Sequence, residues 1–207
     1  MYTIQTLVVG QLKTNCYLIY ANNSDKSLII DPGDEADFII QKINDYGVIP
    51  VGIIATHAHF DHIQAVAELK LAFNIPFYLH AKDKFLLQYY RSSAKYFTGI
   101  DPGPAPSVDK FIKEGDVIKT ENMSILIIET PGHTPGCVCL YNKNEKIIFS
   151  GDTIFANGDV GRTDHKYSDP LVFSKSVKKI LSLSKATIVY PGHGPKTTIG
   201  QEFKKIE

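Results

Sequence analysis

The stretch THAHFDH, Thr56 to His62, contains three of the seven histidines of this 207-residue chain, together with an aspartate. It directly follows the apolar run VGIIA, residues 51–55, which is typical of a buried strand. The next residues, 61–73, have apolar side chains at helical spacing, so an amphipathic helix is predicted there. His57 and His59 therefore lie between strand and helix, and Asp61 and His62 lie in the first turn of the helix. So many polar side chains at such a turn are costly to bury without a use.

Three further apolar strands predicted from the sequence end in a similar way. The stretch ILIIETPGH ends at His133, IIFSGD ends at Asp152, and TIVYPGH ends at His193. Glycine or proline beside each of these residues allows the backbone to turn sharply. Ligands of α/β sheets are held outside the carboxyl ends of the strands, so we expect the side chains to converge there. The candidate metal ligands are His57, His59, Asp61, His62, His133, Asp152 and His193.

Imidazole and carboxylate groups together suit divalent ions such as zinc, iron or manganese. Seven ligands exceed the needs of one tetrahedral ion, so we expect two ions. Each residue alone has an ordinary alternative, since Asp61 could cap the following helix and a single histidine could be hydrogen-bonded in the core. All seven together favour metal binding. Two other histidines serve as contrasts. We interpret His80 as structural and His165 as a loop residue, with a substrate contact as the alternative for His165.

The rest of the chain predicts an α/β protein of short strands and amphipathic helices. Gly47 is expected to end the first helix, and Asp169 and Pro170 to begin the last. The segment 98–107, TGIDPGPAPS, is typical of a long loop or hinge between halves. The expected strands lie at about 3–8, 16–20, 27–30, 51–55, 76–80, 123–129, 137–141, 146–149 and 187–190, and the helices at about 35–46, 61–73, 82–90 and 168–183.

Composition does not indicate a nucleic-acid or membrane partner. Twenty-two basic and 22 acidic residues balance, which leaves no electrostatic attraction for a phosphate backbone or an anionic membrane. No apolar run approaches the roughly 20 residues of a spanning helix, and the N-terminus does not resemble a signal peptide, so we expect a cytoplasmic protein. Cys16, Cys137 and Cys139 are too few for a disulfide framework and are interpreted as buried small hydrophobes. A small-molecule substrate is expected, and the oligomeric state stays open.

The motifs THAHFDH, TPGHTPG, SGDTIF and YPGHG, with NCYLI and IIDPG nearer the start, resemble those of the metallo-β-lactamase fold superfamily. The resemblance covers nearly the whole chain and is greatest to the glyoxalase II-like (hydroxyacylglutathione hydrolase-like) enzymes. It implies one domain, residues 1–207, folded as an α/β four-layer αββα sandwich whose halves meet near residues 98–110. It also implies a dinuclear site: His57, His59 and His133 for one ion, Asp61, His62 and His193 for the other, and Asp152 as the bridge.

Two divalent ions would lower the pKa of a shared water towards about 7 and so supply hydroxide at neutral pH. Asp61 and Asp152 are the expected catalytic residues because they would orient this water, although Asp61 could instead act through His62. A thiolate is a good leaving group without a strong acid, because the pKa of a thiol is about 8.5, so a thioester or related ester is the expected substrate. Zinc is the expected metal, with iron or manganese as alternatives.

The resemblance leaves the substrate open. Glyoxalase II enzymes carry a helical domain with glutathione contacts where this chain ends, and their loop after the bridging aspartate differs from residues 154–167, so specific recognition of glutathione is not expected. Arg162 could contact an anionic substrate, but an ion pair with Asp159 or Asp164 is favoured.

Three alternatives to a thioesterase also remain. A mononuclear iron sulfur (persulfide) dioxygenase would use His57, His133 and Asp152. A β-lactamase or lactonase of the same fold is the second, although an aspartate at position 152 argues against antibiotic hydrolysis as the main activity. A non-catalytic metalloprotein is the third.

Overall fold

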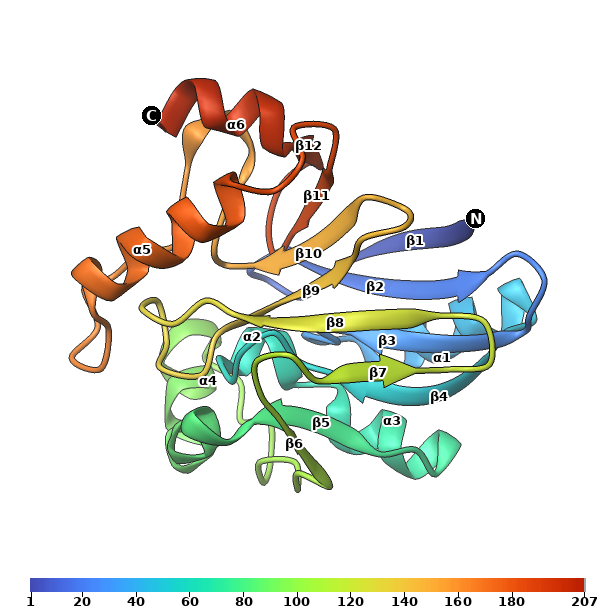
Figure 1. Cartoon of the computed structure of the whole chain (residues 1–207). Coiled ribbons are helices and arrows are strands. Elements are labelled where there is room, and N and C mark those ends of the chain that lie inside the picture. Colours follow the sequence, from blue (N-terminus) through green and yellow to red (C-terminus); the bar gives the residue numbers. More distant parts are fainter. Residues whose placement is uncertain (207) are drawn as a thin grey trace.

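Two six-stranded sheets form the centre of the computed structural model, which describes residues 1–206. The first sheet has the order β1-β2-β3-β4-β5-β6, with β1 (Tyr2–Val9), β2 (Thr14–Ala21), β3 (Lys26–Ile30), β4 (Ile49–Ile54), β5 (Phe77–His80) and β6 (Lys110–Ile112). The second has the order β12-β11-β10-β9-β8-β7, with β7 (Val117–Lys119), β8 (Ser124–Glu129), β9 (Val138–Asn142), β10 (Ile147–Gly151), β11 (Ile188–Pro191) and β12 (Thr197–Thr198). The sheets lie face to face, with helices outside (Figure 1).

The layer between the sheets is built from alternate residues of apolar strands. Ile19 of β2 lies opposite Leu28 of β3 in the antiparallel register, and both side chains are buried. Tyr17 packs across the layer against Phe149 of β10, with ring centroids 5.0 Å apart. Full burial of such a side chain contributes about 1.5–3 kcal/mol, so this layer holds the two sheets together.

Helices cover the outer face of each sheet. The apolar stripe of the first helix places Ile39 and Ile43 in one core cluster with residues of the first sheet. Phe173 and Val177 of the last long helix pack in another cluster with residues of the second sheet. The α-helices are α1 (Ala36–Tyr46), α2 (Phe60–Ile63), α3 (Val66–Phe73), α4 (Tyr90–Thr98), α5 (Pro170–Leu181) and α6 (Ile199–Ile206), and the 3-10 helices are η1 (Ala81–Gln88) and η2 (Ala156–Gly158). The predicted αββα layering is confirmed.

The predicted helix ends of α1 and α5 are confirmed. Gly47 follows α1 with a φ of 63°, a left-handed conformation that glycine adopts without a steric penalty. The carboxylate of Asp169 accepts hydrogen bonds from the backbone N–H groups of Leu171 and Val172, both at 3.0 Å, and Pro170 begins α5.

The continuous helix predicted over residues 61–73 is wrong. Two helices, α2 and α3, are separated by residues 64–65. The backbone N–H of Ala65 donates to the carbonyl of Pro32 at 3.0 Å instead of continuing the helical ladder. This partner lies in a distant loop, so the interruption is set by tertiary contacts, not by local sequence.

The region after β5 also differs from prediction. The helix expected at about 82–90 is the 3-10 helix η1, and it is followed by α4, which the apolar pattern did not indicate because its side chains are mostly polar or exposed. Residues 99–109 contain no helix or strand, as the Pro-rich segment suggested, but β6 follows and still belongs to the first sheet. The chain therefore crosses to the second sheet between β6 and β7.

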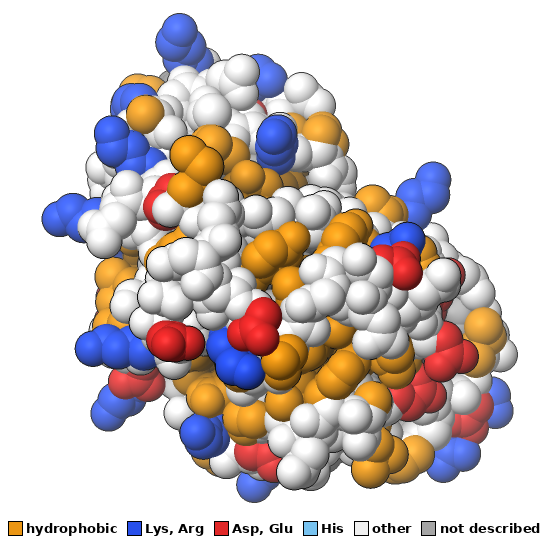
Figure 2. All heavy atoms as spheres, turned by 90° about the vertical axis from the view of Figure 1, so that its right-hand side faces the viewer, with side chains coloured by type: hydrophobic (Ala, Val, Ile, Leu, Met, Phe, Trp, Pro, Cys, Tyr) orange, Lys and Arg blue, Asp and Glu red, His pale blue; other side chains and the backbone are white. Residues whose placement is uncertain are grey.

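The surface shows no large region of one charge on the face turned to the viewer in Figure 2. Acidic and basic side chains surround exposed hydrophobic side chains there, in agreement with the balanced composition. Among the helices of residues 1–206, none has both the length and the apolar character that crossing a bilayer requires.

Candidate metal centre

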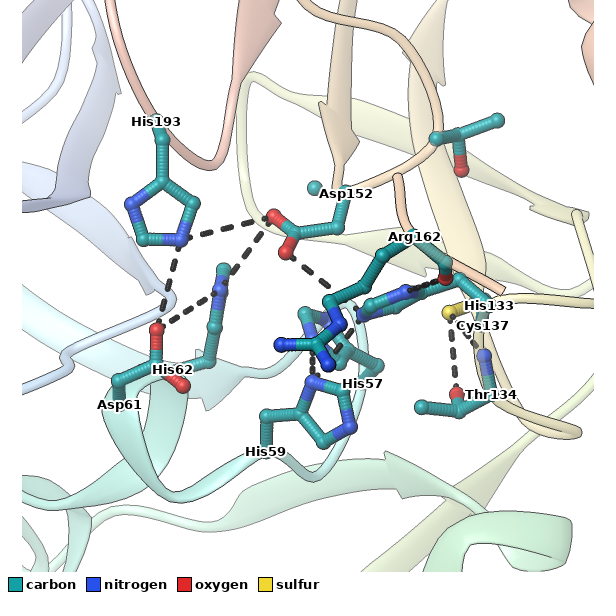
Figure 3. A network of polar contacts seen from close by, with 12 residues as sticks. His57, His59, Asp61, His62, His133, Thr134, Cys137, Asp152, Arg162 and His193 are labelled. Carbon is teal, nitrogen blue, oxygen red and sulfur yellow. Dashed lines mark hydrogen bonds and ion pairs between the residues drawn. The ribbon is translucent and has the colours of Figure 1, made fainter. Parts of the chain in front are cut away.

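Four turns at one edge of the sandwich bring the seven candidate ligands together (Figure 3). His57 and His59 lie in the turn between β4 and α2, and Asp61 and His62 lie on α2 itself. His133 follows β8, Asp152 follows β10, and His193 follows β11. Residues 74 positions or more apart in the sequence thus lie within contact distance, because both sheets end at this edge.

The first group of ligand atoms comes from His57, His59 and His133. Nε2 of His57 lies 3.0 Å from Nδ1 of His59, and Nε2 of His133 lies 3.1 Å from the same atom. Three imidazole nitrogens therefore face one point. This is the donor set of a histidine-rich divalent metal site.

The second group comes from Asp61, His62 and His193. Oδ2 of Asp61 lies 3.7 Å from Nε2 of His62 and 3.4 Å from Nε2 of His193. One carboxylate and two imidazoles therefore surround a second point.

Asp152 lies between the two groups, as Figure 3 shows. Its Oδ2 is 3.6 Å from Nε2 of His133. Its Oδ1 is 3.4 Å from Nε2 of His62 and 3.8 Å from Nε2 of His193. Each oxygen faces a different group, which is the arrangement that a bridging carboxylate requires.

Two buried atoms at the centre test whether a cation fits. Nε2 of His62 and Oδ1 of Asp152 have no hydrogen-bond partner within residues 1–206. An unsatisfied buried polar atom costs about 1–3 kcal/mol. A divalent cation between these atoms would satisfy both, so the residues fit a metal.

The electrostatics of the site favour a cation as well. Burial, followed by repulsion between neighbouring imidazoles, lowers the pKa of both His57 and His59, which keeps them in the neutral form that binds metals. Burial alone would lower the pKa of His62, but the negative charges of Asp152, Asp61 and Asp31 raise it to about 10. Protonated His62 is the positive charge that these carboxylates attract, and a metal cation would replace its proton.

In each of the five ligand histidines, one ring nitrogen faces an oxygen atom outside the centre. The other ring nitrogen then faces the centre and is the one that could bind a metal. Nε2 of His59 lies 2.8 Å from the hydroxyl of Tyr167, so Nδ1 faces the centre. In the other four histidines Nδ1 faces the oxygen atom and Nε2 faces the centre. Their partners are Thr56 Oγ1 for His57 at 3.2 Å, Arg162 carbonyl for His133 at 2.7 Å, Leu12 carbonyl for His193 at 3.1 Å, and Asp31 Oδ2 for His62 at 3.2 Å. The last contact is too poorly aligned to count as a hydrogen bond.

Glycine is required where the backbone approaches a ligand. A Cβ at position 192 would lie 2.3 Å from Oδ1 of Asp152 and 2.8 Å from a ring carbon of His62. The PG dipeptide before His193 therefore both turns the chain and leaves space for two ligand side chains.

The two histidines outside the predicted ligand set, His80 and His165, differ in their distance from the site. His80 is buried, with its Nε2 2.9 Å from Oε1 of Glu129, outside the ligand groups. His165 lies next to the first group instead: its ring centroid is 5.3 Å from that of His59, and it stacks on Tyr167 at 5.0 Å. The interpretation of His165 as an ordinary loop residue is therefore incomplete.

Arg162 forms the ion pair that the sequence favoured, and its partner is Asp164. Nε and one terminal nitrogen contact the two carboxylate oxygens of Asp164 at 2.6 and 2.8 Å. The backbone carbonyl of Arg162 accepts a hydrogen bond from His133. Arg162 thus supports the site through its main chain.

Sequence reasoning missed several supporting residues. Asp31 accepts hydrogen bonds from the backbone N–H and the hydroxyl of Thr56 at 2.7 and 2.8 Å, and the motif IIDPG was the available signal. No sequence motif pointed to Asp83 or Tyr167, because the residues that they contact in the site lie far away in the sequence. The three cysteines are buried and free, as expected.

The chain is similar in sequence to known proteins along most of its length. A sequence model described as the Metallo-beta-lactamase superfamily matches residues 9–193. Hydroxyacylglutathione hydrolase GloC of Haemophilus influenzae is 34% identical over 207 residues, with 96% of this chain and 94% of that protein covered.

Two solved structures are similar over almost their full length. The BLEG-1 B3 metallo-beta-lactamase has 35% identity and a TM-score of 0.90, with 99% of this chain and 97% of that chain covered. TTHA1623, solved in a di-iron-bound form, has 37% identity and a TM-score of 0.88, with 97% and 98% covered.

Proposed function

Because the chain belongs to the metallo-beta-lactamase superfamily, we propose that it is a hydrolase of a thioester or related ester that depends on two divalent metal ions. The observation that carries this proposal is the position of Asp152, whose two carboxylate oxygens face separate ligand groups. His57, His59 and His133 would hold one ion, and Asp61, His62 and His193 the other. Asp152 would bridge them.

Two bound ions would supply hydroxide at neutral pH and polarise the substrate carbonyl. Asp61 and Asp152 would accept hydrogen bonds from the attacking water and so fix its direction. The hydroxyl of Thr14 lies 3.3 Å from Oδ2 of Asp61 and keeps this carboxylate in place. Zinc is the metal we propose, since it suits imidazole and carboxylate ligands, and iron is the alternative that the di-iron-bound relative supports.

A thioester is favoured on chemical grounds. A thiolate leaves readily because the pKa of a thiol is about 8.5, so the site needs no strong acid for the leaving group. The relative named hydroxyacylglutathione hydrolase supports the same class, because hydroxyacylglutathione is a thioester.

A β-lactam is the second candidate substrate, and the similarity to the BLEG-1 enzyme favours it. Hydrolysis of a β-lactam amide expels an amine, a far poorer leaving group than a thiolate, and therefore demands more of the site. We accordingly rank β-lactams below thioesters.

Metal analysis followed by a substrate panel tests this function. Protein purified without added metal should contain close to two divalent ions per chain and should hydrolyse simple thioesters or S-lactoylglutathione faster than nitrocefin or a lactone. A single iron per chain with oxygen uptake on a persulfide would instead identify a sulfur dioxygenase. Metal without turnover of any of these substrates would contradict the proposed activity.

A further inference from the structure

Asp83 is a buried carboxylate that connects the turns of the first ligand group. It lies on η1, after β5, and its side chain is fully buried. Oδ2 accepts hydrogen bonds from the backbone N–H of Ala58 at 3.0 Å and from the hydroxyl of Thr134 at 2.7 Å. Oδ1 accepts from the backbone N–H of Gly136 at 2.6 Å.

These three donors lie beside the ligands of the first group. Ala58 lies between His57 and His59 in the turn after β4, which belongs to the first sheet. Thr134 follows His133 directly, in the turn between β8 and β9 of the second sheet. One carboxylate thus connects both turns that carry the first group, although they come from different sheets.

The fit around Asp83 is tight. A Cβ at position 136 would lie 2.7 Å from Oδ1 of Asp83, so glycine is needed for the backbone to reach the carboxylate. Among the hydrogen bonds of residues 1–206, none joins Asp83 to the ligands of the second group, Asp61, His62 and His193.

We propose that Asp83 is a positioning residue that sets the separation of His133 from His57 and His59, and thereby the affinity of the first metal ion alone. The inference rests on the proposed metal site. Residues that hold ligands in place typically contribute about 10–100-fold to metal affinity when they are lost. An asparagine at this position keeps the volume but has one acceptor oxygen, so an amide NH2 group would face at least one of the three donors.

Variants that lack one ligand of one group allow the affinity of each ion to be measured separately. His193→Ala should break the second group and leave one ion on the first, and His59→Ala should do the reverse. Zinc affinity is then measured by competition with a chelator, with and without Asp83→Asn in each background. We expect Asp83→Asn to weaken zinc binding by about 10–100-fold in the His193→Ala background. In the His59→Ala background the affinity should stay unchanged.

Two further variants complete the test. Asp109→Asn is the matched control, because Asp109 also accepts a backbone hydrogen bond, from Phe77 at 2.8 Å, outside the ligand groups. Thr134→Val removes only one of the three bonds to Asp83, so it provides the same comparison if Asp83→Asn does not fold, with an expected loss of about tenfold in the first group.

Equal losses in both backgrounds would show a general structural role and overturn the proposal, and so would unchanged affinity in both. Wild-type protein that binds no metal would instead overturn the proposed function itself.

Discussion

Nε2 of His62 lies 3.4 Å from Oδ1 of Asp152, and both atoms are buried without a hydrogen-bond partner within residues 1–206. One atom belongs to α2 in the first half of the chain, and the other follows β10 in the second. Their approach therefore depends on the packing of the two sheets. A cation between these two atoms would remove the cost of leaving both of them without a polar partner.

Replacement of Asp152 should damage both ligand groups. Because its two oxygens face different groups, Asp152→Ala should reduce bound metal and lower thioester turnover by about 100-fold or more, at or above the top of the range for lost metal-site support. The fold should persist, since the strands beside it keep their apolar burial. Metal content, turnover and circular dichroism of one preparation check this.

Asp45→Ala is a suitable control for that experiment. Asp45 pairs with Lys42 at 2.9 Å on α1, at an exposed position. His165 is unsuitable as a control because it lies beside His59. Near-normal turnover of Asp152→Ala with both ions retained would show that Asp152 is not the bridge.

Gly192→Ala should remove metal binding while the chain remains folded. The added Cβ would overlap Oδ1 of Asp152, and this overlap must displace the carboxylate from both groups. Gly47→Ala serves for comparison: the backbone of Gly47 has a φ of 63°, which strains any added side chain, but no atom lies within 4 Å of the added Cβ. That variant should lose some stability and no metal. Metal analysis of the two variants tests this prediction. Full metal content in Gly192→Ala would contradict the ligand geometry.

The cysteines should be dispensable for metal binding. Cys16, Cys137 and Cys139 are buried, and burial raises the pKa of all three thiols, which disfavours the thiolate that binds metals. A triple alanine variant should keep its metal and its turnover and lose only stability, through small cavities. Loss of metal from a folded triple variant would reveal a thiolate ligand. In the native protein, a thiol reagent should also react much more slowly than after unfolding.

The side chain of Arg162 should have little effect on the metal. Its guanidinium is paired with Asp164 at an exposed position, whereas its carbonyl holds His133. Arg162→Ala preserves that carbonyl, so metal content and turnover of an uncharged thioester should stay close to wild type. The KM for S-lactoylglutathione, measured in parallel, shows whether the arginine contacts an anionic substrate. A large fall in bound metal would mean that the ion pair itself maintains the loop.

The strand ends were the most predictable part of the site. Short apolar runs followed by Gly, Pro and a polar residue identify turns. In the second sheet β8, β10 and β11 run in the same direction, so His133, Asp152 and His193 follow strand ends at one edge. Strands of two or three residues, such as β6 and β12, are too short to show a period, and α4 lacks an apolar stripe.

The supporting residues were hard to predict for a different reason. Asp83 and Tyr167 act on ligands that lie far away in the sequence, so only the folded chain shows which backbone groups and imidazoles they contact. Likewise, the break between α2 and α3 depends on a hydrogen bond to Pro32. Local patterns contain no information about such partners.

Titration of metal-free protein with zinc, with thioester turnover measured at each addition, tests the central claim most directly. Two ligand groups joined by Asp152 predict that turnover is absent without metal and reaches its plateau at close to two ions per chain. Turnover that needs no metal, or that is complete at one ion per chain, would contradict the dinuclear hydrolase.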